Sequence, residues 1–135
     1  MRRYLHTAVP IVVLAVSYFC TGVLGLSLAT VHPSASAVWP PSGIALAAIL
    51  LWGSWLWPGI FLGAFLVNVF VQGSVLATLG IALGNTFEAV IGAALVCRFA
   101  GGRKAFDQSK NILKFTVFAG ILGPAVAATV GVISL

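Results

Sequence analysis

Long apolar runs separated by short polar breaks make up most of the chain, and their lengths predict membrane-crossing helices. The first run covers 8–31 and exceeds the roughly 20 apolar residues that a helix needs to cross a bilayer. Two shorter runs, 43–56 and 58–71, each correspond to only about 21 Å of helix at 1.5 Å per residue. Runs at 75–99 and 112–135 follow. The pattern predicts an all-α polytopic transmembrane helix bundle of about five membrane segments, two of them short.

Prolines and glycines mark where these helices begin, bend or stop. The string Trp39-Pro40-Pro41-Ser42-Gly43 predicts extended backbone, because each proline lacks an N–H and biases the preceding residue away from helix. Pro10 is expected in the first turn of the first helix, and Pro124 is expected to bend or break the last one. Gly101-Gly102 predicts the end of the fourth helix. The region 43–71 either crosses twice or forms a re-entrant hairpin.

Composition supports the membrane interpretation. Hydrophobic residues form 61% of the chain and charged residues only 7%, whereas an average soluble domain carries about a quarter charged residues. A soluble domain of this size could not bury so much apolar surface. The net charge of +5 gives no basic face on a soluble body, so no nucleic-acid partner is expected. The lipid bilayer is the expected partner, and Cys20 and Cys97 are expected to be free thiols.

The distribution of charge predicts the topology. Arg2 and Arg3 open the chain, and the other five basic residues lie within 98–114. With a cytoplasmic N-terminus and five passes, all seven basic residues fall on the cytoplasmic side, as the positive-inside rule requires. The turn at 53–57 then also lies inside, where its tryptophans form an aromatic belt. Residues 1–135 form one domain, and the apolar run that reaches Leu135 leads us to expect truncation at the C-terminus.

Glu88 is the most informative candidate for chemistry, because a carboxyl group in a membrane span is costly and usually functional. Gly80, Gly84, Glu88 and Gly92 recur at four-residue steps, so a stripe of small residues carries the carboxyl group and is expected to face another helix. One interpretation is a polar clamp, in which Glu88 hydrogen-bonds Asn68, Asn85 or an exposed carbonyl near Pro40. The other is a ligand or proton site within the bundle.

The expected break at Trp39 is the second candidate site. Unwound backbone in a membrane is tolerated where protein or water satisfies it, and broken helices can build binding sites from their exposed ends. The alternative is a rigid turn. The small-xxx-small spacings Gly59–Gly63 and Gly80–Gly84 favour internal packing over a dimer face, although a homodimer stays a candidate assembly.

Residue patterns for catalysis are not found in the sequence. It contains no Ser/His/Asp set, no paired carboxylates and no cysteine cluster, and His32 has no second histidine at ligand spacing. We therefore expect no enzyme activity, no metal and no cofactor.

Three strings in this order resemble the bacterial membrane-associated sensor domain of the first type, the MASE type-one family. They are Val-Trp-Pro-Pro-Ser-Gly-Ile-Ala at 38–45, Leu-Trp-Pro-Gly-Ile-Phe-Leu-Gly-Ala at 56–64 and Ala-Leu-Gly-Asn-Thr-Phe-Glu-Ala at 82–89. The resemblance implies a multi-pass inner-membrane input domain of about eight spans that precedes a cytoplasmic histidine kinase or diguanylate cyclase. The present chain would be its N-terminal part, without the output domain.

Three functions stay open at this point. The first is a sensory input module of a two-component or cyclic di-GMP signalling protein, with Glu88, Asn85, Asn68 and Trp39 as candidate ligand-binding residues. The second is a substrate-binding or transporter-like membrane subunit, suggested by the short helices and the buried acid. The third is a structural anchor.

Overall fold

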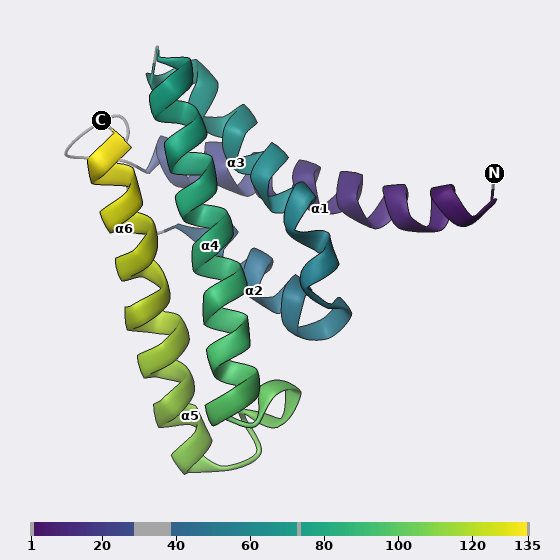
Figure 1. Ribbon diagram of the computed structural model, residues 1–135, viewed down its shortest axis with the longest axis vertical. Helices are drawn as coiled ribbons and strands as arrows, with labels where there is room; N and C mark the ends of the chain where they lie inside the picture. The colour runs from purple at the N-terminus through teal and green to yellow at the C-terminus, as the bar shows by residue number, and fades with distance from the viewer. Residues whose placement is uncertain (1, 29–38, 73, 135) are drawn as a thin grey trace.

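The computed structural model describes residues 2–28, 39–72 and 74–134, and helices account for most of them (Figure 1). Three short segments interrupt the α-helices: two 3₁₀ turns, η1 and η2, and one π-helix, η3. In chain order the elements are α1 Arg2–Ser27, α2 Pro40–Trp52, η1 Ser54–Leu56, α3 Trp57–Gln72, α4 Val75–Phe99, η2 Gly102–Lys104, α5 Ser109–Phe115, η3 Thr116–Leu122 and α6 Gly123–Ser134.

The predicted all-α bundle is confirmed. In the described part of the chain, four helical stretches are long and apolar enough to cross a membrane, and they are Thr7–Ser27, Ser54–Val71, Val75–Phe99 and Ser109–Ser134. The third apolar run reaches this length because η1 extends α3 at its start. Helix α2, with 13 residues, is a shorter apolar helix. The chain is therefore a multi-pass membrane protein, with five helical segments among the described residues.

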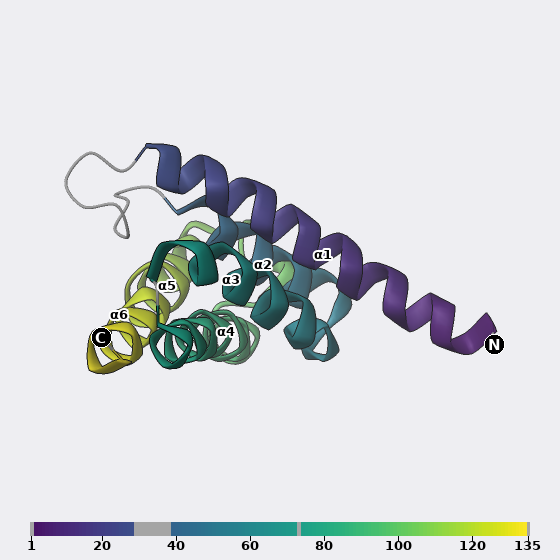
Figure 2. The same ribbon diagram turned by 90° about the horizontal axis from the view of Figure 1, so that it is seen from above.

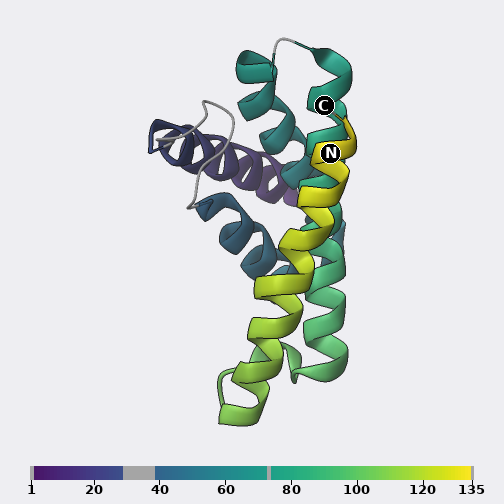
Figure 3. The ribbon, with the colours of Figure 1, turned by 90° about the vertical axis from the view of Figure 1, so that its left-hand side faces the viewer.

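The helices form two close pairs, α1 with α3 and α4 with α6, and these pairs also contact each other. Helices α4 and α6 lie side by side along the longest axis of the molecule, and α5, η3 and α6 continue one another (Figure 3). Helix α1 packs against α3 and crosses the α4–α6 pair steeply (Figures 1 and 2). Helices α2 and α3 each contact both α1 and α4, so they connect the two pairs.

Glycines bring the helices of each pair close together. A Cβ atom at Gly63 would lie 2.7 Å from the Tyr18 Cβ, and one at Gly59 would lie 2.6 Å from the Ile11 carbonyl oxygen. On the other pair, a Cβ at Gly84 would lie 3.1 Å from the Val130 Cβ. Close approach of this kind is how small residues drive helix association in lipid. Both small-xxx-small spacings therefore serve internal packing, as predicted.

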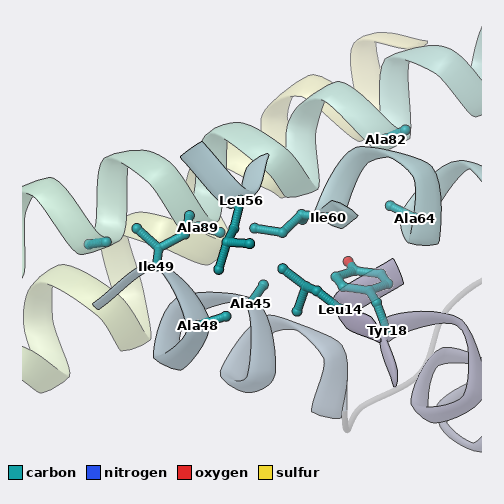
Figure 4. Close-up of a cluster of buried hydrophobic side chains, with 11 residues drawn as sticks. Leu14, Tyr18, Ala45, Ala48, Ile49, Leu56, Ile60, Ala64, Ala82 and Ala89 are labelled. Atoms are coloured by element: carbon teal, nitrogen blue, oxygen red, sulfur yellow. The ribbon is translucent and has the colours of Figure 1, made fainter. Parts of the chain in front are cut away.

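A small apolar core joins α1, α2, α3 and α4. Tyr18 and Leu14 of α1 point toward Ala45 of α2 and Ile60 of α3 (Figure 4). Many larger apolar side chains lie instead on the outer surface, for example Leu76 and Ile133, which are about four-fifths exposed (79% and 80%). Lipid replaces water as the solvent of such an outer face. Both cysteines, Cys20 and Cys97, are free, as predicted.

Two predictions about prolines are wrong. The backbone is not extended across 39–43, because Pro40 and Pro41 occupy the first turn of α2. Proline is tolerated there, since backbone N–H groups in the first turn have no partner within the helix. Only Trp39, at φ −123° and ψ 79°, is outside the helix. Pro10 lies inside α1 rather than in its first turn, because the helix already begins at Arg2, before the apolar run.

The end of α4 follows its predicted signal, whereas the last helix differs from the prediction. Gly101 and Gly102 both have positive φ, at 81° and 58°, a conformation that stops a helix at little cost in glycine. Pro124 does not break the last helix. The seven residues before α6 form the π-helix η3, a local widening of the helix that the sequence did not predict.

Candidate functional site

Glu88 lies at the centre of α4 and faces the last helix. Its side chain is only 7% exposed, and a Cβ atom at Gly123 would lie 3.4 Å from the Glu88 Cγ. The other members of its stripe also face protein: Gly80 lies against Ser134 and Gly84 against Val130, whereas Gly92 lies nearest to Leu46 of α2 and next to Ala119. The prediction that this stripe faces protein is therefore confirmed, and Glu88 points into the bundle.

The polar group that faces Glu88 comes from α2. The Ser42 hydroxyl lies near the Glu88 carboxyl group and is placed to donate to it, and both residues line the same cleft. Ser42 lies two residues after Pro40, so the clamp partner comes from the predicted neighbourhood but is a side chain and not an exposed carbonyl. The Tyr18 hydroxyl on α1 also lies within electrostatic range of Glu88.

The two asparagines do not join this cluster. The Asn85 amide donates to the Ile81 carbonyl at 2.8 Å, and the buried Asn68 amide donates to the Ala64 carbonyl, also at 2.8 Å. Each bond runs back by four residues within its own helix, which is a common way to satisfy a polar side chain in an apolar setting. The predicted hydrogen bonds from Asn68 and Asn85 to Glu88 are therefore wrong.

Trp39 has a packing role that is visible in its contacts. Its indole Nε1 donates to the Tyr18 hydroxyl at 3.4 Å, and the ring packs against the apolar core. Trp39 thereby ties the start of α2 to the middle of α1. Tyr18 is fully buried, so this bond gives its hydroxyl a partner inside the protein.

A cleft of about 400 Å³ opens beside Glu88. Three parts of the chain form its walls: one face of α2, the middle of α4, and the stretch from the basic loop to the start of α6. Its lining residues are Ser42, Gly43, Leu46, Ala47, Leu50, Glu88, Ala89, Phe106, Phe115, Ala119, Gly120 and Pro124. Ser42 and Glu88 are the polar side chains in this set, so the cleft is apolar except at one place.

The π-helix η3 supplies the far wall of this cleft. In η3 the Gly123 N–H bonds the Phe118 carbonyl, five residues back. The Ala119 carbonyl would normally accept from Gly123 in an α-helix or from residue 124 in a π-helix. Because Gly123 is already used and Pro124 has no N–H, the Ala119 carbonyl lacks both of its usual helical donors. Ala119 lines the cleft, and single π segments of this kind recur at functional sites.

Arg103 connects the basic loop to α2, and sequence reasoning missed this contact. Its Nε donates to the Leu50 carbonyl at 2.9 Å, and its Nη2 donates to the Leu51 carbonyl. These carbonyls belong to the last turn of α2, where a cation is favourable. The contact places the tryptophan-rich turn and the basic loop at the same end of the bundle. No local pattern indicates it, because 53 residues separate Arg103 from Leu50.

A family model, MASE1, matches residues 10–135. The chain belongs to the MASE1 family. MASE1 is a membrane-associated sensor domain found in signalling proteins. No match was found among curated proteins or among solved structures.

The three strings that carry the family resemblance correspond to three contacts of this MASE1 domain. The first holds Trp39 and Ser42, which contact Tyr18 and Glu88; Val38, at its start, lies outside the described residues. The second holds Gly59 and Gly63, where α3 packs on α1. The third contains Glu88. The strings therefore coincide with the residues that join α1, α2, α3 and α4.

Proposed function

We propose that this MASE1 domain is the sensory input module of a bacterial signalling protein whose cytoplasmic output domain is a histidine kinase or a diguanylate cyclase. It would act in the inner membrane, with the N-terminus and the basic loop in the cytoplasm, and a homodimer is the assembly in which such output domains would be brought together. The observation that carries the proposal is the Glu88 cleft within a domain of a sensor family. Carboxyl groups inside membrane spans usually mark functional sites, and this supports the proposal.

Helix α2 is the element that would transmit the signal. At its start Ser42 meets Glu88 of α4, and at its end Arg103 binds the carbonyls of Leu50 and Leu51. A stimulus that changes the contact between Ser42 and Glu88 would shift α2 as a rigid rod. Because α2 has only 13 residues, that shift would reach the basic loop about 20 Å away. Transmission requires the stimulus to favour one of two packings over the other.

The test uses the intact parent protein, with kinase or cyclase activity measured in membranes. Glu88→Gln and Ser42→Ala each weaken the contact between α2 and α4 while preserving side-chain size approximately. We expect either variant to lock the output at one level, so that its response to the stimulus falls at least about tenfold, which corresponds to about 1.4 kcal/mol of coupling.

Thr86→Val is the matched control for this experiment. Thr86 is a buried polar residue of the same helix, but its hydroxyl donates to the Ala82 carbonyl of α4 and does not line the Glu88 cleft. We expect this variant to respond normally. A normal response from Glu88→Gln, at unchanged protein level, would contradict the proposed role of the cleft.

A substrate-binding or transporter-like subunit is the second candidate, and one observation favours it. The cleft is flanked by the widened helix η3 and Pro124, and transporters often build substrate sites at interrupted helices. Uptake into vesicles that contain the parent protein separates the two candidates. Accumulation of a solute that depends on Glu88 would favour transport, whereas a change in output activity without uptake favours sensing.

A further inference from the structure

The cleft beside Glu88 runs along one face of α2. Ser42, Leu46 and Leu50 follow one another at four-residue steps on one face of this helix, so the lined face is about 12 Å long at 1.5 Å per residue. The Ser42 end carries the hydroxyl and carboxyl groups. The Leu50 end lies beside Phe106 and Phe115 and is apolar. The cleft is therefore polar at one end and apolar along the rest of its length.

The polar end is rich in hydrogen-bond acceptors. The Glu88 carboxyl group and the Ser42 hydroxyl both accept hydrogen bonds. The Ala119 carbonyl on the opposite wall lacks both of its usual helical donors, because the Gly123 N–H bonds Phe118 and Pro124 has no N–H. A carbonyl without a donor in an apolar surrounding is costly, so a ligand that donates hydrogen bonds at this end would satisfy groups that the helices leave open.

We propose that this cleft binds a small amphiphile whose hydrogen-bond-donating end, a hydroxyl or an amine, lies between Glu88, Ser42 and Ala119. Its apolar body lies along Leu46 and Leu50 toward Phe115. The cleft volume of about 400 Å³ falls within the range of small-molecule sites. The inference deepens the proposed function by giving the class of molecule that the sensory site would detect, and its test is direct binding and not signalling.

One glycine in the wall of the cleft provides a way to fill it, and a second glycine outside the cleft provides the control. A Cβ atom at Gly43 would meet nothing within 4 Å, and Gly43 lines the cleft. The Cβ of a leucine at this position therefore has room, and the rest of the side chain can extend into the cleft. A Cβ atom at Gly131 on α6 would also meet nothing within 4 Å, but Gly131 is not among the residues that line the cleft. Gly131→Leu is thus a matched control for Gly43→Leu.

The experiment uses the whole chain in lipid nanodiscs with decan-1-ol that carries a photoreactive diazirine on its alkyl chain. After illumination, mass spectrometry locates the labelled residues. We expect the probe to label Leu46, Leu50 and Phe115. Excess decan-1-ol or decylamine should suppress this labelling, whereas decane should not, because decane has no hydrogen-bond donor. Labelling of these residues is lost in Gly43→Leu and kept in Gly131→Leu. In Glu88→Leu, about tenfold more competitor is needed, the effect expected from the loss of one hydrogen bond.

Two results would overturn the proposal. Equal labelling of Gly43→Leu and Gly131→Leu, spread over the lipid-facing residues, would show that the probe only samples the bilayer. Competition by decane as strong as by decan-1-ol would show that the polar end plays no part. Either result leaves the sensory function to be decided by the output assay in the parent protein, so the two failures are distinguishable.

Discussion

The guanidinium of Arg103 donates from Nε to the Leu50 carbonyl at 2.9 Å, across 53 residues of chain. A second donor on the same group reaches Leu51. The last carbonyls of a helix have no partner within the helix, so Arg103 acts as the C-terminal cap of α2. The contact binds the basic loop to the helix that lines the Glu88 cleft. It therefore links the candidate site to the stretch 98–114, where five of the seven basic residues lie.

Replacing Arg103 should loosen this end of α2. We expect Arg103→Ala to lower the unfolding free energy by about 1 kcal/mol, since it removes charge-assisted hydrogen bonds at an exposed site. Arg103→Lys should recover only part of that loss, because the lysine ammonium group lacks the planar guanidinium whose fixed N–H groups reach both carbonyls at once. Thermal unfolding in nanodiscs measures the change, and hydrogen exchange of the α2 backbone locates it.

Lys104→Ala is the control for the Arg103 variants. Lys104 neighbours Arg103 and carries the same charge, but among the described residues its side chain makes no hydrogen bond to α2. We expect unchanged exchange rates in α2. Equal effects of Lys104→Ala and Arg103→Ala would show that net charge, and not capping, stabilises this end.

The contact between α1 and α3 should fail when Gly63 gains a methyl group. Its Cβ would lie 2.7 Å from the Tyr18 Cβ and 2.9 Å from the Ala15 carbonyl oxygen, so Gly63→Ala forces the two helices apart. We expect a loss of about 1–3 kcal/mol, as in other overpacked cores. Gly131→Ala, where a Cβ meets nothing within 4 Å, should be neutral or slightly stabilising. Thermal unfolding of the two variants side by side tests this, and equal stability would contradict the close packing.

Helix α4 and the packing faces of α3 and α4 could be predicted from the sequence because each depends on a local signal. The run 75–99 coincides with α4 to the residue, since Ser74 caps its start and the double glycine ends it. The four-residue stripe through Glu88 correctly predicted a face turned toward another helix, because that periodicity is a property of one helix alone. The internal packing of Gly59 and Gly63 was also predicted correctly from their four-residue spacing.

The partners of these residues could not be predicted in the same way. Glu88 meets Ser42 and not Asn85, because Asn85 bonds its own helix at Ile81. A side chain that can bond its own backbone competes with any tertiary partner, and sequence spacing does not decide that competition. Arg103 was missed for a related reason, since its partners are backbone carbonyls, which have no signature in the sequence.

Trp39 and Tyr18 should be coupled, but weakly. Their hydrogen bond is long, at 3.4 Å, so we expect Tyr18→Phe to cost about 0.5–1.5 kcal/mol of stability and Trp39→Phe to cost more through lost packing. The double variant isolates the bond itself. We expect a coupling energy below about 1 kcal/mol in thermal unfolding. Strictly additive effects would show that Trp39 holds α2 to α1 by ring packing alone.

The π-helix should depend on Pro124, which has no N–H to offer the preceding turn. In Pro124→Ala the new N–H can bond the Gly120 carbonyl, and Gly123 can return to Ala119, so η3 should convert to an ordinary α-helix. Removing a proline from a helix interior favours the helix by up to about 3 kcal/mol, and we expect slower hydrogen exchange across 119–124. The conversion would also satisfy the Ala119 carbonyl and narrow the cleft beside Glu88. Unchanged exchange in this stretch would show that packing against α4, and not the proline, widens the helix.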